Sequence, residues 1–285
     1  MANCMLGFPN RADQSVLSGG AYFSTLPLQN LQTRVIGEVA RTTNTALAST
    51  QFSIDFGRSV KVQVIALRNH NFSIAARYRI VGADVADFST LLSDSGWADV
   101  WPVIYPFGTL EWEDDNWWSG KYTEEERAGY TTELDYLLPT AKLARYWRIE
   151  IDDVGNTAGY VQMGRLFIGP AWQPKLNMIY GASLGWETKT SVQEAKSGAE
   201  YFDIRIPYRV QRFTLDGMRQ DEAFTRAFEM QRQAGIHGEI LFIQNPHDTI
   251  HSLRRRFMAR LRTLSPIEYP YFHINSAAFE LKELL

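Results

Sequence analysis

Apolar residues recur at every second position in many short segments of this chain, and this period restricts the fold more than any other feature. In residues 52–57, for example, Phe52, Ile54 and Phe56 alternate with Ser and Asp. A period of two places one row of side chains on a buried face and the other toward solvent, so it predicts β-strands. Short strands separated by turn residues favour an antiparallel sandwich.

The same period continues as far as residue 170. We expect Val60, Val62 and Val64 to share one face of a strand, because polar residues separate them. Trp147 and Ile149 alternate with Arg and Glu in the same way. Gly, Asn or Asp residues bound each segment. The other predicted strands of this part are residues 76–82, 145–151 and 159–169.

Two regions lack this period. Residues 1–50 are rich in Ser, Thr, Asn and Gly, and they predict a loop-rich arm with a short strand or two. Residues 97–120 form a long aromatic insert that is neither strand-like nor helical, and such loops are usually functional or mobile. The insert supplies six candidate contact residues: Trp97, Trp101, Tyr105, Trp112, Trp117 and Trp118.

The pattern changes after residues 169–174, where two prolines and a glycine mark the expected domain boundary. A clean alternation follows in residues 201–213. Pro207 within it cannot donate a hydrogen bond to a neighbouring strand, so one side of this strand is expected to be an edge. The residues expected to face a core are Phe202, Ile204, Ile206, Tyr208 and Val210.

Residues 216–238 predict the best helix of the chain. We expect Phe224, Ala227 and Phe228 to form its apolar stripe and Gly235 to suit its C-terminal cap. The order of strand, helix and further strands predicts a small α+β or β-barrel domain with one packed helix. The further strands are predicted at residues 239–246, 254–264 and 271–284.

Length and composition limit the functions that fit. A chain of 285 residues exceeds what one core usually needs, so two domains are expected. The net charge of -3 disfavours a nucleic-acid role. The only cysteine, Cys4, excludes an intrachain disulfide and a multi-cysteine zinc site. No secretory signal and no long apolar stretch is present, which predicts a soluble protein made in the cytoplasm.

Two polar clusters are candidates for chemistry. His247 and His251 have the i, i+4 spacing of two ligands on one helix face, beside Asp248. A zinc site needs a third ligand and a helix, whereas the Asn-Pro pair before them favours a turn, so a polar loop is the stronger interpretation. The acidic run from Glu111 to Asp115 leaves three interpretations open: a solvated loop, calcium chelation or catalysis.

No nucleophile–base arrangement and no phosphate-binding loop is suggested. Residues 181–185, GASLG, lack the lysine and the spacing of a P-loop. We therefore expect no enzyme activity, no cofactor and no metal.

The aromatic insert and a row of arginines are the candidate contact surfaces. The aromatic residues have three interpretations: packing on their own sandwich, contact with another protein, or stacking on a sugar face. The arginines also have three: a solvated face, a subunit contact, or a nucleic-acid contact, which the lack of interleaved aromatic residues disfavours. The arginines expected at subunit contacts are Arg205, Arg209, Arg254, Arg256, Arg260 and Arg262.

Several motifs, taken in order, resemble the discoidin-like, galactose-binding-like jelly roll. The resemblance covers residues 51–170 and implies an antiparallel jelly-roll sandwich in which Arg145 and Tyr146 have an architectural role. The long aromatic insert and the missing cysteines depart from the family pattern. The motifs are Asp-Phe-Gly at 55–57, Tyr-Arg-Ile at 78–80, Asp-Ser-Gly-Trp at 94–97 and Arg-Tyr-Trp-Arg-Ile at 145–149.

The arrangement of the whole chain is similar to tail proteins of long-tailed bacteriophages. Residues 175–285 resemble the hub domain of distal tail proteins. This resemblance implies a structural virion protein, made in the host cytoplasm, that forms a homo-oligomeric ring, expected to be a hexamer. Such a ring would join the tail tube to the tip, contact other tail proteins and carry the jelly roll outward. The residues themselves leave three and six copies open.

A second hypothesis is a carbohydrate-binding protein of the tail tip that acts in host adsorption. Its partner would be a host-surface glycan. Assembly predicts large oligomers with or without sugar, whereas adsorption predicts saturable glycan binding through Trp112 or Trp117.

Overall fold

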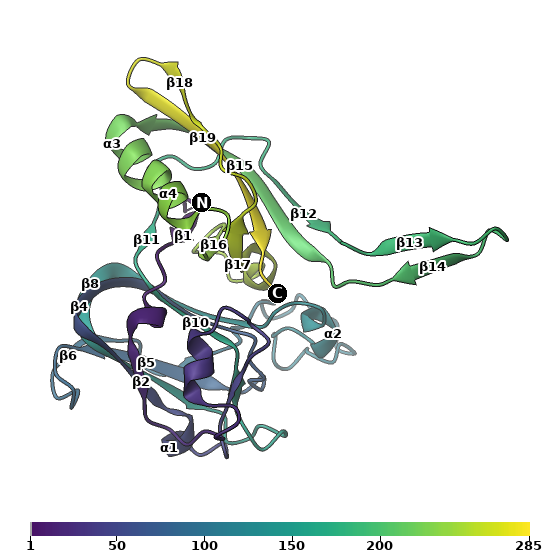
Figure 1. Cartoon of the computed structure of the whole chain (residues 1–285). Coiled ribbons are helices and arrows are strands. Elements are labelled where there is room, and N and C mark those ends of the chain that lie inside the picture. The colour runs from purple at the N-terminus through teal and green to yellow at the C-terminus, as the bar shows by residue number, and fades with distance from the viewer. Residues whose placement is uncertain (1) are drawn as a thin grey trace.

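The computed structural model describes residues 2–285 and contains two large antiparallel sheets (Figure 1). The predicted fold class, mainly β with antiparallel sheets and one packed helix, is confirmed. The first sheet has the order β10-β4-β8-β5-β6, with β2 beside β4 and β7 beside β5. Its strands are β2 (Val16–Ser18), β4 (Phe52–Arg68), β5 (Arg77–Ala83), β6 (Leu91–Asp94), β7 (Ala98–Asp99), β8 (Glu133–Asp152) and β10 (Arg165–Gly169).

The second sheet is built mainly from the C-terminal part of the chain. Its order is β11-β1-β16-β17-β19-β15-β12, with β18 beside β19. Its strands are β1 (Met5–Gly7), β11 (Ala171–Trp172), β12 (Ser183–Glu187), β15 (Tyr208–Arg219), β16 (Ile240–Ile243), β17 (Arg256–Leu261), β18 (Ile267–Tyr271) and β19 (Ile274–Glu283). Two small pairs complete the β-structure: β3 (Ala40–Arg41) with β9 (Gln162–Met163), and β13 (Ser191–Glu194) with β14 (Glu200–Asp203).

The helices are short except for one. It runs without a break through α3 (Gln220–Glu222), a π-helical segment (Ala223–Phe228) and α4 (Glu229–Ala234). No helix within residues 2–285 has the length and apolar character needed to span a membrane. The others are α1 (Leu47–Thr50), α2 (Glu124–Arg127), α5 (Ser252–Arg255) and two 3-10 turns at Ala12–Gln14 and Leu28–Gln32.

Strand β1 belongs to the second sheet although it stands at the start of the chain. It pairs with β11 on one side and with β16 on the other, so Leu6 lies between Trp172 and Phe242. The N-terminal segment of residues 1–50, which was expected to be rich in loops, therefore holds short strands. The first of them, β1, belongs to a sheet formed mainly by the C-terminal part of the chain. Along the sequence, the chain contributes β1 to the second sheet, then forms the first sheet, and then forms the rest of the second sheet. The division into domains stays a prediction.

The core of the first sheet follows the predicted alternation. Phe52, Ile54, Trp147 and Ile149 are buried, and Ile54 is the register partner of Trp147. A Cβ at Gly82 would lie 2.9 Å from the Trp147 ring. Glycine is therefore required at this position of β5, because the indole ring lies where a larger side chain would begin.

The expectation that Val60, Val62 and Val64 share one face is wrong. The register of β4 against β8 shifts between Val62 and Val64, which marks a β-bulge. Between these positions β4 advances two residues while β8 advances five, from Leu137 to Lys142, so the extra residues lie on β8 and the side chains of β4 change face across the shift. Val62 thus packs in the first core, whereas Val64 points toward the second sheet and packs with Leu241 and Met258. This second apolar cluster holds the two sheets against each other.

The predicted helix is present, but its buried stripe differs from the expected one. Ala227 is buried as predicted, whereas Phe228 is exposed and its ring lies 5.8 Å from that of Phe224. Small side chains at the contact let the helix approach the sheet closely, and the two rings lie outside that contact. Gly235 ends the helix with φ +51°, which confirms the predicted cap. The buried stripe consists of Ala223, Ala227, Met230 and Ala234.

The strand predicted at residues 201–213 begins in the second sheet only at Tyr208. Tyr208 and Val210 are buried as expected. Phe202, Ile204 and Ile206 do not face a core, because the chain before Tyr208 leaves the body with the β13–β14 hairpin (Figure 1). The alternation identified side chains that favour burial, but no described residue of this chain covers them.

Candidate functional site

The projecting hairpin is the first candidate contact surface, and residues 188–207 are called the arm below. It extends from β12 and β15 at the edge of the second sheet, well away from both cores (Figure 1). Hydrogen bonds between Thr190 and Arg205 tie its two chain segments together at the base. Val192 and Phe202 are register partners, so their side chains share one face of the hairpin.

The arm exposes an unusual amount of apolar surface. Ile204 is 81% exposed and Ile206 is 70% exposed, although a period-two pattern usually buries such residues. Tyr201 also points into solvent. Isolated exposed apolar side chains are common, but a contiguous row of them on a projecting hairpin is typical of an interaction surface.

The arginines expected at subunit contacts do not form one face. Arg205 lies on the arm and pairs with Asp203 at 2.9 Å, both exposed. Arg209 is buried, and its guanidinium binds Glu283 and donates to the Leu253 carbonyl at 2.7 Å. Its charge is thus satisfied within the chain, contrary to the expected surface role.

The row at residues 254–262 is also divided. Arg254 lies on α5, before the strand begins, and faces the Tyr122 ring at 5.8 Å. Arg256 is buried and donates to the Asp248 carbonyl at 2.9 Å. The predicted single strand face fails because the strand begins only at residue 256. Arg260 donates to the Ile236 carbonyl at 3.1 Å, and Arg262 pairs with Glu187 at 2.7 Å.

The six aromatic residues of the insert separate into two groups. Trp101 is buried in the first core and donates to the Phe72 carbonyl. Trp97 is half-buried beside the Arg77 guanidinium, and Tyr105 is half-buried with its hydroxyl bonded to Glu126. These three side chains pack on their own body.

The other three tryptophans form the second candidate surface, called the aromatic cluster below. It consists of Trp112, Trp117 and Trp118 together with Phe107, which the sequence reasoning missed. The rings of Trp117 and Trp118 lie 4.5 Å apart at near right angles. Trp118 is 82% exposed, so the rings contact one another and leave a large apolar area in solvent.

Both polar clusters lie in turns. All four carboxylates of the acidic run are exposed, and Asp114 accepts a hydrogen bond from the Glu111 backbone in a turn. The His251 backbone likewise donates to Asp248, so residues 247–251 form a turn rather than a helix, and Asp248 pairs with Arg255 on α5. Residues 2–285 contain no group of three or more His, Cys, Asp or Glu side chains placed to hold a metal.

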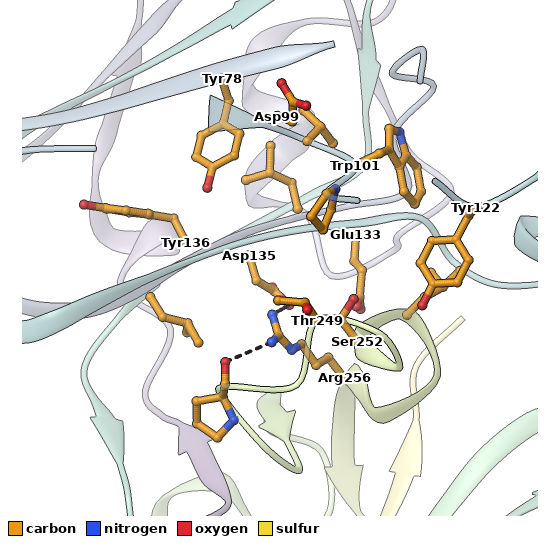
Figure 2. Close-up of a pocket in the computed structure, with 16 residues that line it drawn as sticks. Tyr78, Asp99, Trp101, Tyr122, Glu133, Asp135, Tyr136, Thr249, Ser252 and Arg256 are labelled. Atoms are coloured by element: carbon orange, nitrogen blue, oxygen red, sulfur yellow. Dashed lines mark hydrogen bonds and ion pairs between the residues drawn. The ribbon is translucent and has the colours of Figure 1, made fainter. Parts of the chain in front are cut away.

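A pocket between the two sheets is the third candidate, and no sequence pattern indicates it. Its volume is about 290 Å³. Figure 2 shows Tyr78, Trp101 and Tyr122 on the side of the first sheet, with Glu133 and Asp135 from β8. The second half of the chain supplies the opposite wall. That wall contains Thr249, Ser252 and Arg256.

Glu133, Asp135 and Arg256 of this pocket belong to a group of buried charges that also includes Arg68. The Arg68 guanidinium lies 2.7 Å from Asp135 and 3.3 Å from Glu133, and Arg256 lies 3.8 Å from Asp135. Burial raises the pKa of Glu133 to about 8, against the lowering effect of Arg68. The neighbouring Asp135 carboxylate adds to this rise, because two like charges disfavour each other. Glu133 is therefore mainly protonated at neutral pH.

No protein-family model and no curated protein sequence matches this chain. Among solved structures it is similar to the lectin domain of lectinolysin in complex with Lewis b antigen, at 14% identity over 57% of this chain and 96% of that one, with a TM-score of 0.38. It is also similar to the family 32 carbohydrate-binding module of NanJ from Clostridium perfringens in complex with galactose. There the identity is 12% over 59% of this chain and 99% of that one, with a TM-score of 0.37.

A third similar structure is a fucose-binding module of Streptococcus pneumoniae, at 10% identity over 56% of this chain and 94% of that one, with a TM-score of 0.36. Scores this low leave the ligands and partners of this chain to be argued from its own geometry.

Proposed function

We propose that this chain is a structural subunit that assembles with further copies of itself through the arm. The observation that carries the proposal is the exposed row of apolar side chains, above all Ile204 and Ile206. Their alternation is that of a half-buried strand, yet the arm extends away from every core of its own chain (Figure 1). Another molecule must therefore supply the covering surface.

The geometry favours a heterologous contact. The arm projects from one edge of the second sheet, so it would reach the body of a neighbour rather than an identical arm. Contacts between two different surfaces of the same protein close into a ring when the rotation between copies permits it.

In its finer form, the proposal is a hub protein of the distal tail of a long-tailed bacteriophage. The ring would be hexameric, join the tail tube to the tip proteins, and carry the first sheet on its outside. Support comes from the second sheet with its single packed helix and from the arm at its edge. The proposed location is the virion tail, after synthesis in the host cytoplasm.

The aromatic cluster favours a second candidate function, binding of a host-surface glycan. Exposed indoles stack on sugar faces because the rings bury much apolar area at a small entropic cost. Trp112 and Trp118 present such rings to solvent. The two functions are compatible, because the arm and the cluster lie on different parts of the chain.

Sedimentation velocity of the full chain and of an Ile204→Ser, Ile206→Ser variant tests assembly. Full burial of an isoleucine side chain contributes about 1.5 to 3 kcal/mol, so burying the exposed parts of both contributes about 2 to 4 kcal/mol. The variant should raise the dissociation constant about 30- to 1000-fold. Its thermal stability should stay unchanged, since both side chains are already in solvent.

Val154→Ser is the matched control, because Val154 is similarly exposed on the other half of the chain. This variant should assemble like the unmodified protein. The proposal fails if the full chain stays monomeric at high concentration, or if the double variant and the control assemble equally well.

A further inference from the structure

A second pocket, called the basic pocket below, lies at the opposite edge of the second sheet from the arm. Its volume is about 350 Å³. In the strand order of that sheet, β11 and β1 form one end, whereas β15 and β12, which carry the arm, form the other. The helix of residues 220–234 and the arm accordingly lie on opposite sides of the sheet (Figure 1). The lining of the basic pocket includes Phe8, Arg11, Lys61, Trp172, Arg226 and Met230.

The three basic side chains of this pocket lack an acidic partner. Arg11, Lys61 and Arg226 form no ion pair with any side chain of residues 2–285, and Lys61 and Arg226 are exposed. The acidic residue of the lining, Glu229, already pairs with Arg232 at 2.7 Å. Positive charges around one cavity repel each other, so the pocket favours an acidic occupant.

The rest of the lining is apolar. Met230 is buried, Trp172 is 9% exposed, and Phe8 packs against the second core while it stays partly open. An occupant that fills the pocket therefore needs an apolar part beside its acidic groups. A small inorganic anion would meet the basic side chains and leave the apolar wall uncovered.

The arm carries the complementary pattern on one face. Val192 and Phe202 are register partners, and Glu194 and Glu200 form the next pair on the same face, nearer the tip. All four side chains are exposed, and neither glutamate forms an ion pair with a side chain of residues 2–285. Like charges directly opposite each other destabilise a hairpin, so basic groups from another molecule would relieve this repulsion.

The two surfaces cannot meet within one chain, because the arm points away from the basic pocket of its own body (Figure 1). Between copies, a contact from one edge of the sheet to the opposite edge of the next is the heterologous contact that continues from chain to chain. Opposite charges on the two surfaces also steer the copies together in one orientation.

We propose that the arm of one copy docks in the basic pocket of the next. Glu194 and Glu200 meet the basic side chains, and the apolar pair beside them packs on the apolar wall. The docking rests on the assembly proposed above and specifies the surface that receives the arm.

Charge reversal on the full chain tests this docking by sedimentation velocity. The arm variant is Glu194→Lys, Glu200→Lys, and the pocket variant is Lys61→Glu, Arg226→Glu. Each variant alone places like charges against each other, so it should raise the dissociation constant of the assembly at least about tenfold. The melting temperature should stay unchanged, because all four side chains are exposed.

An equimolar mixture of the two variants should assemble again. Each lysine-bearing arm then finds a pocket with glutamates, and each unmodified arm finds an unmodified pocket. Glu38→Lys, Glu124→Lys is the matched control, because it changes the net charge as the arm variant does at exposed positions outside both surfaces. This control should assemble like the unmodified chain.

The unmodified chain separates the docking from the assembly on which it rests. If that chain stays monomeric at high concentration, both are overturned. If it assembles, the docking alone is overturned by any of three results: either variant assembles as well as the unmodified chain, the mixture stays dissociated, or the control weakens assembly as much as the arm variant does.

Discussion

The buried carboxyl of Glu133 makes the stability of this protein depend on pH in a way that can be worked out. Glu133→Gln removes the titrating group and keeps the shape of the side chain. In the folded chain, burial raises the pKa of Glu133 from 4.5 to about 8. Between these two values the folded state holds a proton that the unfolded state has released, so raising the pH favours unfolding.

The size of the effect follows from the same linkage. Each pH unit within that interval removes about 1.4 kcal/mol from the free energy of unfolding. Buried His70 titrates in the opposite sense, but only below pH 6.5. From pH 6.5 to 8, only Glu133 of these two groups changes its protonation. The free energy of unfolding of the unmodified chain should therefore fall by about 2 kcal/mol over this range, and that of Glu133→Gln should not.

Urea denaturation followed by tryptophan fluorescence at pH 6.5 and pH 8 measures this difference. Trp147 lies in the first core and reports its unfolding. We expect the midpoint of the unmodified chain to fall with pH and that of Glu133→Gln to stay nearly constant. Parallel losses in both proteins would refute the reasoning, because they would show that Glu133 is ionised in the folded state throughout this range.

Two further predictions concern other parts of the chain. Burial against Phe72 lowers the pKa of His70 to about 3, so stability present above pH 6.5 is lost as the pH falls. Acid titration of His70→Gln should show a shallower loss than the unmodified chain, and equal slopes would contradict this cause. Trp118→Ala should leave the free energy of unfolding within about 0.5 kcal/mol, because the ring is exposed. Under the glycan hypothesis it should also abolish binding on a glycan array, and an unchanged array signal would count against that hypothesis.

The strands of the first core were predictable because their signal is local. Phe52 and Ile54 alternate with polar residues, and nothing in the fold reverses that pattern. Gly235 was predictable for the same reason, since a helix end needs a residue that tolerates positive φ. Val64 was not, because the register shift against β8 just before it changes the strand face, and no residue type indicates such a shift.

The arm shows a different limit of sequence reasoning. Alternation at Phe202, Ile204 and Ile206 indicates that one face favours burial, but it does not say which molecule buries it. The same period of two is found in a strand that packs in the core of its own chain and in a hairpin whose apolar face is covered by another molecule. Only the position of the arm in the fold separates the two.

The pocket could not be found from the sequence at all. Glu133 and Arg256 belong to different sheets, and each reads as an ordinary polar residue within its own strand. Their meeting depends on the apolar contact between the sheets, to which Val64 contributes after the register shift between β4 and β8. The exposed aromatic residues were easier to recognise, although the sequence did not separate Trp101 in the core from Trp118 at the surface.

Photo-cross-linking from position 206 tests the central claim most directly. A photoreactive phenylalanine analogue at Ile206 contacts solvent in the single chain and the body of a neighbour in the proposed assembly. Irradiation should give a ladder of bands at multiples of 32.6 kDa, and the same analogue at Val154 should give none. The irradiation is carried out at high protein concentration. If the analogue at position 206 then gives a single band at the mass of one chain, the claim that copies join through the arm is contradicted.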